Sequence, residues 1–231
     1  MDSTGARRVF AVDAVAFDLD GTLLDTVHDL AAAVNLLLAE LGHASLSTEV
    51  VRNLIGKGAA DLIGKALARA RGTPPRDGEG AALLPRYQQG YASVLGRQTR
   101  LFPGVRAGLA RTHAAGFRLA VITNKATRFV QPHLEQSGIA HYFEVVIGGD
   151  DAVAKKPDAA PLLLAAKRLG VPPARMLMVG DSVNDVAAAR AAGSPVVVVP
   201  YGYNEGEPPQ TLAADGIVDS LDAVEDWVTR A

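Results

Sequence analysis

Short apolar runs alternate with helical patterns along most of this 231-residue chain. Each run is bounded by Gly, Asn or Asp, and its length predicts a strand buried on both faces. The predicted strands are residues 14–19, 117–123, 145–148, 176–180 and 195–199. The helical patterns around them, each followed by a glycine, are residues 105–115, 127–137, 161–169 and 184–192. This alternation predicts an α/β fold with a parallel sheet and right-handed crossovers.

The segment of residues 27–96 breaks this alternation, because it has helical periodicity but no strand-like run. Apolar stripes at helical spacing occur in three places within it. Their members are Leu30, Val34, Leu37, Leu38 and Leu41, then Leu62, Ile63, Ala66, Leu67 and Ala70, then Leu84, Tyr87, Tyr91 and Leu95. We therefore predict three helices that form a cap over residues 27–96, inserted into a discontinuous core of residues 1–26 and 97–231.

Composition excludes several classes of protein. Lys and Arg total 23 against 25 Asp and Glu, so the chain has no basic field for nucleic acid or an anionic membrane. It has no cysteine, which excludes disulfides and thiolate sites. Residues 9–19 predict a buried strand rather than a signal peptide, because Asp13 and Asp18 interrupt them. We expect a cytoplasmic monomer or homodimer that binds neither nucleic acid nor membrane.

The most specific motif is Asp18-Leu19-Asp20-Gly21-Thr22, at the end of the first predicted strand. A chance match to four of these residues has odds on the order of 10⁻³ in a chain of average composition. In extended backbone, residues two apart face the same side, so both carboxylates can enter one pocket. The alternative is a simple Asp-Gly turn.

A second acidic motif, Gly180-Asp181-Ser182-Val183-Asn184-Asp185, weakens that alternative because it also follows a predicted buried strand. In open parallel sheets, ligands bind beyond the carboxyl ends of the strands, so both acidic motifs should face one cavity. Clustered carboxylates raise one another's pKa unless a cation is present. Oxygen ligands without Cys or paired His favour Mg²⁺ over zinc. All five histidines are expected to be surface or helix-end side chains.

Two further strand ends carry groups that suit a phosphoryl group. Thr123-Asn124-Lys125 follows one strand, and Lys155-Lys156-Pro157 lies beyond another. A hydroxyl, backbone N–H groups and an ammonium are suitable partners for phosphoryl oxygens. Alternatively, Thr123 caps a helix and the lysines are solvated loop charges.

Taken in order, these motifs resemble those of the haloacid dehalogenase-like hydrolase superfamily over nearly the whole chain. The resemblance implies a doubly wound, Rossmann-like core with a helical cap inserted after the first motif. It also implies a phosphatase in which Asp18 attacks phosphorus and Asp20 acts as acid and then base. By the same resemblance, Mg²⁺ is held by Asp18, the Asp20 carbonyl and Asp181, with Asp185 orienting these ligands. Thr123, the Asn124 amide and Lys156 would hold the phosphoryl oxygens.

Several stretches are similar to bacterial phosphoglycolate phosphatases, namely residues 51–59, 123–125, 155–157 and 201–204. The chain departs from that family at Lys57, where Asn is common, and at Ala159, where a second proline is common. The implied reaction hydrolyses a small phosphomonoester, foremost 2-phosphoglycolate. Lys57, between two glycines, could meet the substrate carboxylate or could lie exposed in a plain turn.

The motifs are also compatible with other functions. The alternative closest to the leading one is another small-molecule phosphatase or a phosphosugar mutase of the same superfamily. Cleavage of a carbon–phosphorus bond and dehalogenation are less compatible, because relatives with those activities lack the second acid that Asp20 supplies here. A scaffold protein that has lost its chemistry is expected to lose a charged member of the site, and all are present.

Overall fold

The computed structural model describes residues 8–231, so the start of the predicted core segment 1–26 lies outside the described residues. Within the described part, the main sheet has six parallel strands in the order β6-β5-β2-β7-β8-β9. Their bounds are β2 (Ala14–Phe17), β5 (Arg118–Ile122), β6 (Val145–Ile147), β7 (Met176–Gly180), β8 (Val196–Val198) and β9 (Gly216–Ile217). All five predicted strands form, and the first lies in the middle of the sheet.

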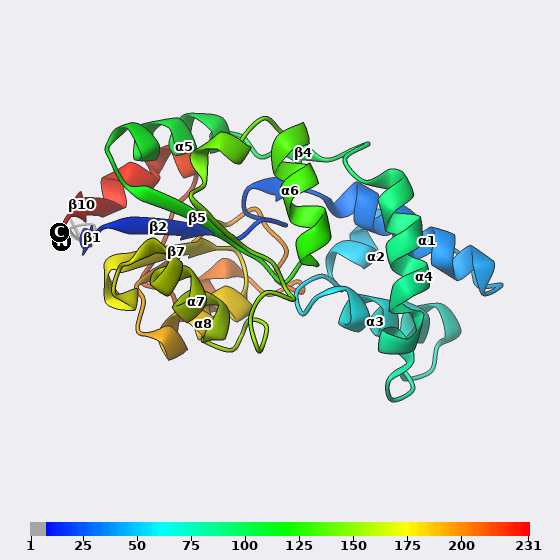
Figure 1. The fold of residues 1–231 in the computed structure, drawn as a ribbon. Coiled ribbons are helices and arrows are strands. Elements are labelled where there is room, and N and C mark those ends of the chain that lie inside the picture. Colours follow the sequence, from blue (N-terminus) through cyan, green and yellow to red (C-terminus); the bar gives the residue numbers. More distant parts are fainter. Residues whose placement is uncertain (1–7) are drawn as a thin grey trace, which may run out of the picture.

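Helices cover both faces of this sheet (Figure 1). Val15 and Phe17 of β2 face one layer, whereas Ala14 and Ala16 face the other, because side chains alternate along a strand. The first layer contains α5 (Val105–Ala114), α6 (Thr127–Gln136) and the 3-10 helix η4 (Leu221–Trp227). The second contains α7 (Ala160–Leu169) and α8 (Val183–Ala192). The predicted doubly wound α/β fold is confirmed.

The cap is helical and lies beyond the carboxyl ends of the central strands (Figure 1). Among the described residues its helices are α1 (Val27–Glu40), α2 (Thr48–Arg52), α3 (Ala59–Arg71) and α4 (Glu79–Val94). Both α1 and α3 pack on α4 around a separate hydrophobic core. The prediction of three helices is wrong because it missed α2. This helix is too short to show a 3.6-residue period in the sequence. The exact division into residues 1–26 with 97–231 and residues 27–96 stays a prediction.

The structure also corrects the prediction of one strand over residues 9–19. Two strands form there, β1 (Phe10–Val12) and β2, and they belong to different sheets. β1 pairs with β10 (Val228–Arg230). The extended run is interrupted between β1 and β2 at Asp13, whose N–H donates to the Arg175 carbonyl at 2.8 Å. An acid inside an apolar run therefore marks a change of sheet.

The remaining elements are short connections. An antiparallel pair, β3 (Leu24–Asp25) and β4 (Arg100–Leu101), joins the chain where it leaves the core for the cap and where it returns. The other 3-10 helices are η1 (Ala140–Tyr142), η2 (Pro173–Arg175) and η3 (Pro209–Thr211). No helix in residues 8–231 combines the length and apolar character needed to cross a membrane.

Candidate active site

A small cavity of about 80 Å³ lies between the sheet and the cap. The strands β5, β2 and β7 are neighbours, and the residues that follow them meet at this cavity. The structure brings together six of the predicted site residues in its lining. These are Asp18, Asp20, Thr123, Asn124, Lys156 and Asp181. Sequence positions more than 160 residues apart thus converge as the topology of a parallel sheet requires.

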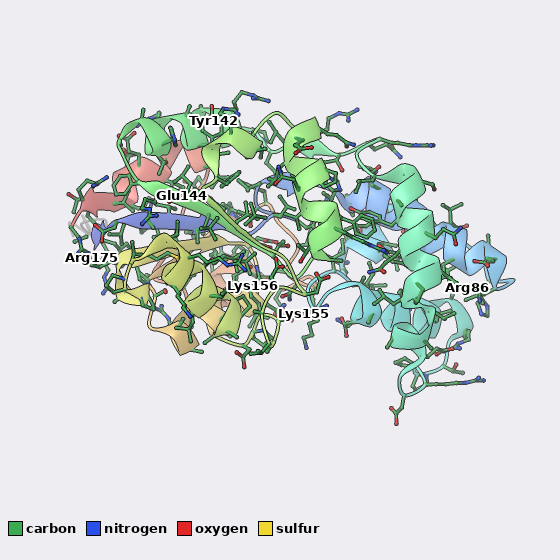
Figure 2. The ribbon with its side chains drawn as sticks, viewed as in Figure 1. Arg86, Tyr142, Glu144, Lys155, Lys156 and Arg175 are labelled. Atoms are coloured by element: carbon green, nitrogen blue, oxygen red, sulfur yellow. The ribbon has the colours of Figure 1, made fainter. Side chains whose placement is uncertain are left out.

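Lys156 is the buried cation at the centre of this group. It is buried, and Figure 2 labels it near the carboxyl ends of the strands. Its ammonium donates to the Ile122 carbonyl at 2.7 Å and to Asp185 Oδ1 at 2.6 Å, and it lies 2.8 Å from Asp18 Oδ1. Although burial opposes the charge, Asp18 and Asp185 raise the pKa of Lys156 above its ordinary value. Lys156 therefore stays charged and holds two carboxylates in place.

Three buried carboxylates outnumber this one cation. Asp18, Asp181 and Asp185 each offer an oxygen within 4.8 Å of the others. Burial is the main cause that raises the pKa of Asp18 to about 7, and Asp185 and Asp20 add to it against the opposing effect of Lys156. Burial, then the charges of Asp18 and Asp185, raise the pKa of Asp181 well above its ordinary value. These oxygen ligands carry more negative charge than Lys156 can neutralise, so they fit a hard divalent cation.

Two glycines make room for Asp181. Gly21 has a positive φ of 95°, and a Cβ there would lie 2.3 Å from Asp181 Oδ2. A Cβ on Gly202 would meet the same oxygen at 2.3 Å. The carboxylate is oriented by Thr22 Oγ1, which donates to Oδ1 at 2.7 Å, and by the Tyr203 N–H, which donates to Oδ2 at 2.6 Å. Gly21 of the first motif thus leaves the space that Asp181 of the second motif occupies.

Asp185 lies in the first turn of α8 and forms a capping box with Ser182. Its Oδ2 accepts hydrogen bonds from Ser182 Oγ at 2.7 Å and from the N–H groups of Ser182 and Asp181 at 3.1 and 3.2 Å. Because Oδ1 accepts from Lys156, both oxygens are engaged and the side chain is fully buried. The geometry suits the orienting role that the sequence predicted for Asp185.

Asp20 interacts with different partners. Its Oδ1 and Oδ2 lie 3.0 and 3.1 Å from the ammonium of Lys125, and Thr26 Oγ1 donates to Oδ1 at 2.8 Å. Burial alone would raise the pKa of Asp20, but Lys125 and Thr26 bring it below its ordinary value. The two acids of one motif therefore have opposite pKa shifts, as is typical of paired catalytic carboxylates.

Thr123 and Asn124 lie beside this pair. Thr123 is buried, and its Oγ1 accepts from the Lys125 N–H at 3.2 Å. The side-chain amide of Asn124 donates to the Lys156 carbonyl at 2.9 Å and to the Gly56 carbonyl at 3.3 Å. Asn124 thus links the core to the cap loop, a contact that the sequence did not predict.

The sequence predicted no role for Lys125, which lines the cavity, or for His133, which lies behind the cavity wall against Tyr91. The signal available for Lys125 was its position after the end of a predicted strand, next to Thr123 and Asn124. His133 lies near the end of α6, but it is fully buried, and its Nε2 is 2.9 Å from the hydroxyl of Tyr91. All five histidines were expected to be surface or helix-end residues. His133 does lie near a helix end, but it is not on the surface. Burial and Lys125 lower the pKa of His133 to about 4, so it is neutral.

The structure does not bring Lys57 to the cavity. Gly56 and Gly58 line it, but the side chain of Lys57 is exposed and is not part of the lining. The plain-turn alternative describes the geometry of Lys57 better than the carboxylate-binding one.

We expect Lys57→Ala to change KM by less than about threefold for 2-phosphoglycolate, the substrate that the sequence resemblance implies, because an exposed charge contributes little to binding. Steady-state kinetics at low and moderate ionic strength measures this. A tenfold rise in KM at both ionic strengths would restore Lys57 as a substrate ligand.

A family model described as haloacid dehalogenase-like hydrolase matches residues 12–193, which is most of the chain. The chain belongs to the haloacid dehalogenase-like hydrolases. It is 48% identical over 210 residues to a phosphoglycolate phosphatase of Nitrosospira multiformis, covering 91% of this chain and 92% of that one. It is 43% identical over 220 residues to a phosphoglycolate phosphatase of Thiobacillus denitrificans, covering 95% and 97%.

Among solved structures, the chain is similar to the crystal structure of a predicted phosphoglycolate phosphatase from Haemophilus somnus. The TM-score is 0.86 at 34% sequence identity, covering 93% of this chain and 97% of that chain. The similarity therefore includes both the core and the cap of this hydrolase.

Proposed function

We propose that this hydrolase is a Mg²⁺-dependent phosphatase that cleaves a small phosphomonoester, foremost 2-phosphoglycolate, through a phosphorylated Asp18. The observation that carries the proposal is the pair Asp18 and Asp20, which line one small cavity, pair with different lysines and have opposite pKa shifts. The names of the relatives support phosphoglycolate as the substrate.

The residues present fit a magnesium ion, because buried carboxylates exceed the cations around them and their pKa values rise as a result. We propose that Asp18, the backbone carbonyl of Asp20 and Asp181 hold it, with Asp185 orienting them. When bound, the ion would neutralise these carboxylates and the charge on the phosphoryl group. The remaining steps rest on the side chains themselves.

Asp18 acts as the nucleophile. One carboxylate oxygen forms a bond to phosphorus while the bond from phosphorus to the leaving oxygen breaks in line with it. Lys156 lies 2.8 Å from Asp18 and is buried, so it fixes the carboxylate and offers positive charge to the phosphoryl oxygens. Thr123 and Asn124 lie at the same rim, and Thr123 Oγ1 and the backbone N–H of Asn124 would complete the set of donors.

Asp20 handles the protons. As the acid, it gives a proton to the departing alkoxide; as the base, it then takes one from the water that attacks the aspartyl phosphate. In the free protein Lys125 and Thr26 favour the charged form. An incoming phosphate dianion would disfavour that form and allow Asp20 to be protonated. Hydrolysis then releases phosphate, restores the Asp18 carboxylate and returns Asp20 to its protonated form, which loses its proton to water once the phosphate has left.

Release of inorganic phosphate tests the proposal. With an aryl phosphate and Mg²⁺, the purified protein should turn over, and chelation should stop it. A panel of small phosphorylated metabolites should then give 2-phosphoglycolate the highest kcat/KM. Absence of turnover with metal present would favour the scaffold alternative, and transfer of phosphate to a second sugar instead of water would favour the mutase.

We expect Asp181→Asn to leave the metal-free protein at least as stable as wild type, because it removes one of the buried like charges. Saturating Mg²⁺ should raise the Tm of wild type by several degrees, since a ligand at about 100 Kd stabilises by about 2.7 kcal/mol. The variant should show little of this shift. Thermal unfolding with EDTA and with MgCl₂ measures both effects.

Asp219→Asn is the matched control for this experiment, because Asp219 is exposed on the surface. It should keep the full Mg²⁺ shift. An equal shift in Asp181→Asn would remove Asp181 from the metal site.

A further inference from the structure

Helix α4 places two tyrosines one turn apart in the wall of the active-site cavity. Tyr87 and Tyr91 are each 2% exposed, and both line the cavity. Their rings stack, with centroids 5.9 Å apart and an interplanar angle of 7°. The two side chains therefore share almost the same surroundings and differ in what their hydroxyl groups contact.

The hydroxyl of Tyr91 is engaged by the protein. It lies 2.9 Å from His133 Nε2, and the ammonium of Lys125 lies 4.7 Å from the centre of the Tyr91 ring. The hydroxyl of Tyr87 is buried and has no hydrogen-bond partner among the described residues. A buried hydroxyl without a partner costs stability and calls for an explanation.

The rest of the cap wall does not explain it. Leu30, Ile55 and Leu62 line the cavity with apolar surface. Gln88, the other polar cap side chain in the lining apart from the tyrosines, accepts from Arg128 Nη2 at 2.6 Å. The Tyr87 hydroxyl is thus an unused donor in a wall that otherwise offers apolar contacts or engaged polar groups.

The charges near Tyr87 indicate what it would bind. Burial is the main cause that raises the pKa of Tyr87 above its ordinary value, so the hydroxyl keeps its proton and can donate. The ammonium of Lys125 lies 4.7 Å from the centre of the Tyr91 ring, on which Tyr87 stacks, and Lys125 and Lys156 are the cationic side chains in the described lining. Lys156 pairs with Asp18 and Asp185, and Lys125 pairs with Asp20, but of these two lysines it is Lys125 that also contacts the cap wall, at the ring of Tyr91. A donor beside an ammonium suits an anionic acceptor oxygen.

We propose that Tyr87 determines substrate specificity by donating a hydrogen bond to an acceptor oxygen on the leaving-group end of the substrate. Where the substrate is 2-phosphoglycolate, that oxygen belongs to its carboxylate. This inference rests on the proposed phosphatase function of the same cavity. It assigns carboxylate recognition to the helix α4 wall instead of to the loop that contains Lys57.

Tyr87→Phe tests the proposal with two esters of nearly equal size. Ethyl phosphate has a methyl group where 2-phosphoglycolate has its carboxylate. The variant should lower kcat/KM for 2-phosphoglycolate about tenfold to hundredfold, mainly through KM, because a hydrogen bond to a charged group is lost. It should change kcat/KM for ethyl phosphate by about twofold or less. The Tm of the free variant should equal or exceed that of wild type, since the hydroxyl has no partner in the protein.

Tyr91→Phe is the matched contrast. It keeps the ring and removes a hydroxyl that His133 engages, so it should lower Tm and leave the ratio of kcat/KM for the two esters at the wild-type value. If Tyr87→Phe also leaves that ratio unchanged, or lowers Tm as much as Tyr91→Phe, the specificity role is overturned. Turnover of an aryl phosphate by all three proteins separates that result from failure of the phosphatase function, which would abolish every activity and overturn both.

Discussion

Asp18→Asn is expected to lower kcat by at least about 10⁴-fold, because the amide has nearly the same shape but cannot attack phosphorus. Lys156 and the neighbouring acids fix the position of this side chain, so no other carboxylate can take its place without moving. Steady-state release of phosphate from an aryl phosphate, with protein purified away from endogenous phosphatases, measures the loss.

The same variant has a predicted effect on stability. Burial raises the pKa of Asp18 to about 7 in the folded protein, above its ordinary value of 3.8. A carboxyl whose pKa is higher in the folded protein than in the unfolded chain stabilises the folded state while it is protonated. Metal-free wild type therefore loses this stabilisation as the pH rises from about 4 through 7. Asp18→Asn lacks this loss and should have a Tm at pH 8 no lower than that of wild type.

Asp13→Asn is the matched control for Asp18→Asn. Asp13 immediately precedes β2, at the end of the strand opposite to Asp18, and pairs with Arg175 at 2.6 Å. Its substitution should leave kcat near the wild-type value. Residual activity above about one part in a hundred in Asp18→Asn, with contamination excluded, would make another group the nucleophile.

Much of the core could be predicted because its signals are local. The strands beginning at Ala14, Arg118 and Met176 are short apolar runs, and glycines such as Gly170 and Gly193 end the helices in a left-handed conformation. Acids that follow such strands must meet at one edge of a parallel sheet. Hence Asp18, Asp20 and Asp181 could be brought together from the sequence.

The contacts that depend on the third dimension could not be predicted. β9 has only two residues, too few for a pattern, and β1 pairs with β10 from the other end of the chain. Tyr87 and Tyr91 show helical spacing, which indicates a buried face but not that the face borders a cavity. Lys57 was plausible because of its flanking glycines, yet side-chain exposure is not encoded in that local pattern.

The second large effect is expected for Lys156→Met, which removes the counter-ion of two buried carboxylates. Breaking a buried ion pair by removing one partner costs about 3–5 kcal/mol, because the remaining charges are left without compensation. The Ile122 carbonyl loses its donor as well. For a chain of this length the loss corresponds to a fall in Tm of roughly 10 °C at neutral pH. Activity should fall below detection, since Asp18 and the phosphoryl group lose their fixed cation.

Lys155→Met provides the control within the same motif. Lys155 is the preceding residue and is exposed, whereas Lys156 is 4% exposed. Substitution of Lys155 should change the free energy of unfolding by less than about 0.5 kcal/mol. Protonation of Asp18 removes the charge that Lys156→Met leaves without a partner. The difference in Tm between wild type and Lys156→Met should therefore shrink as the pH falls toward 5. A fall in Tm that is independent of pH, or that is equal in Lys156→Met and Lys155→Met, would show that packing of the long side chain, and not its charge, maintains the site.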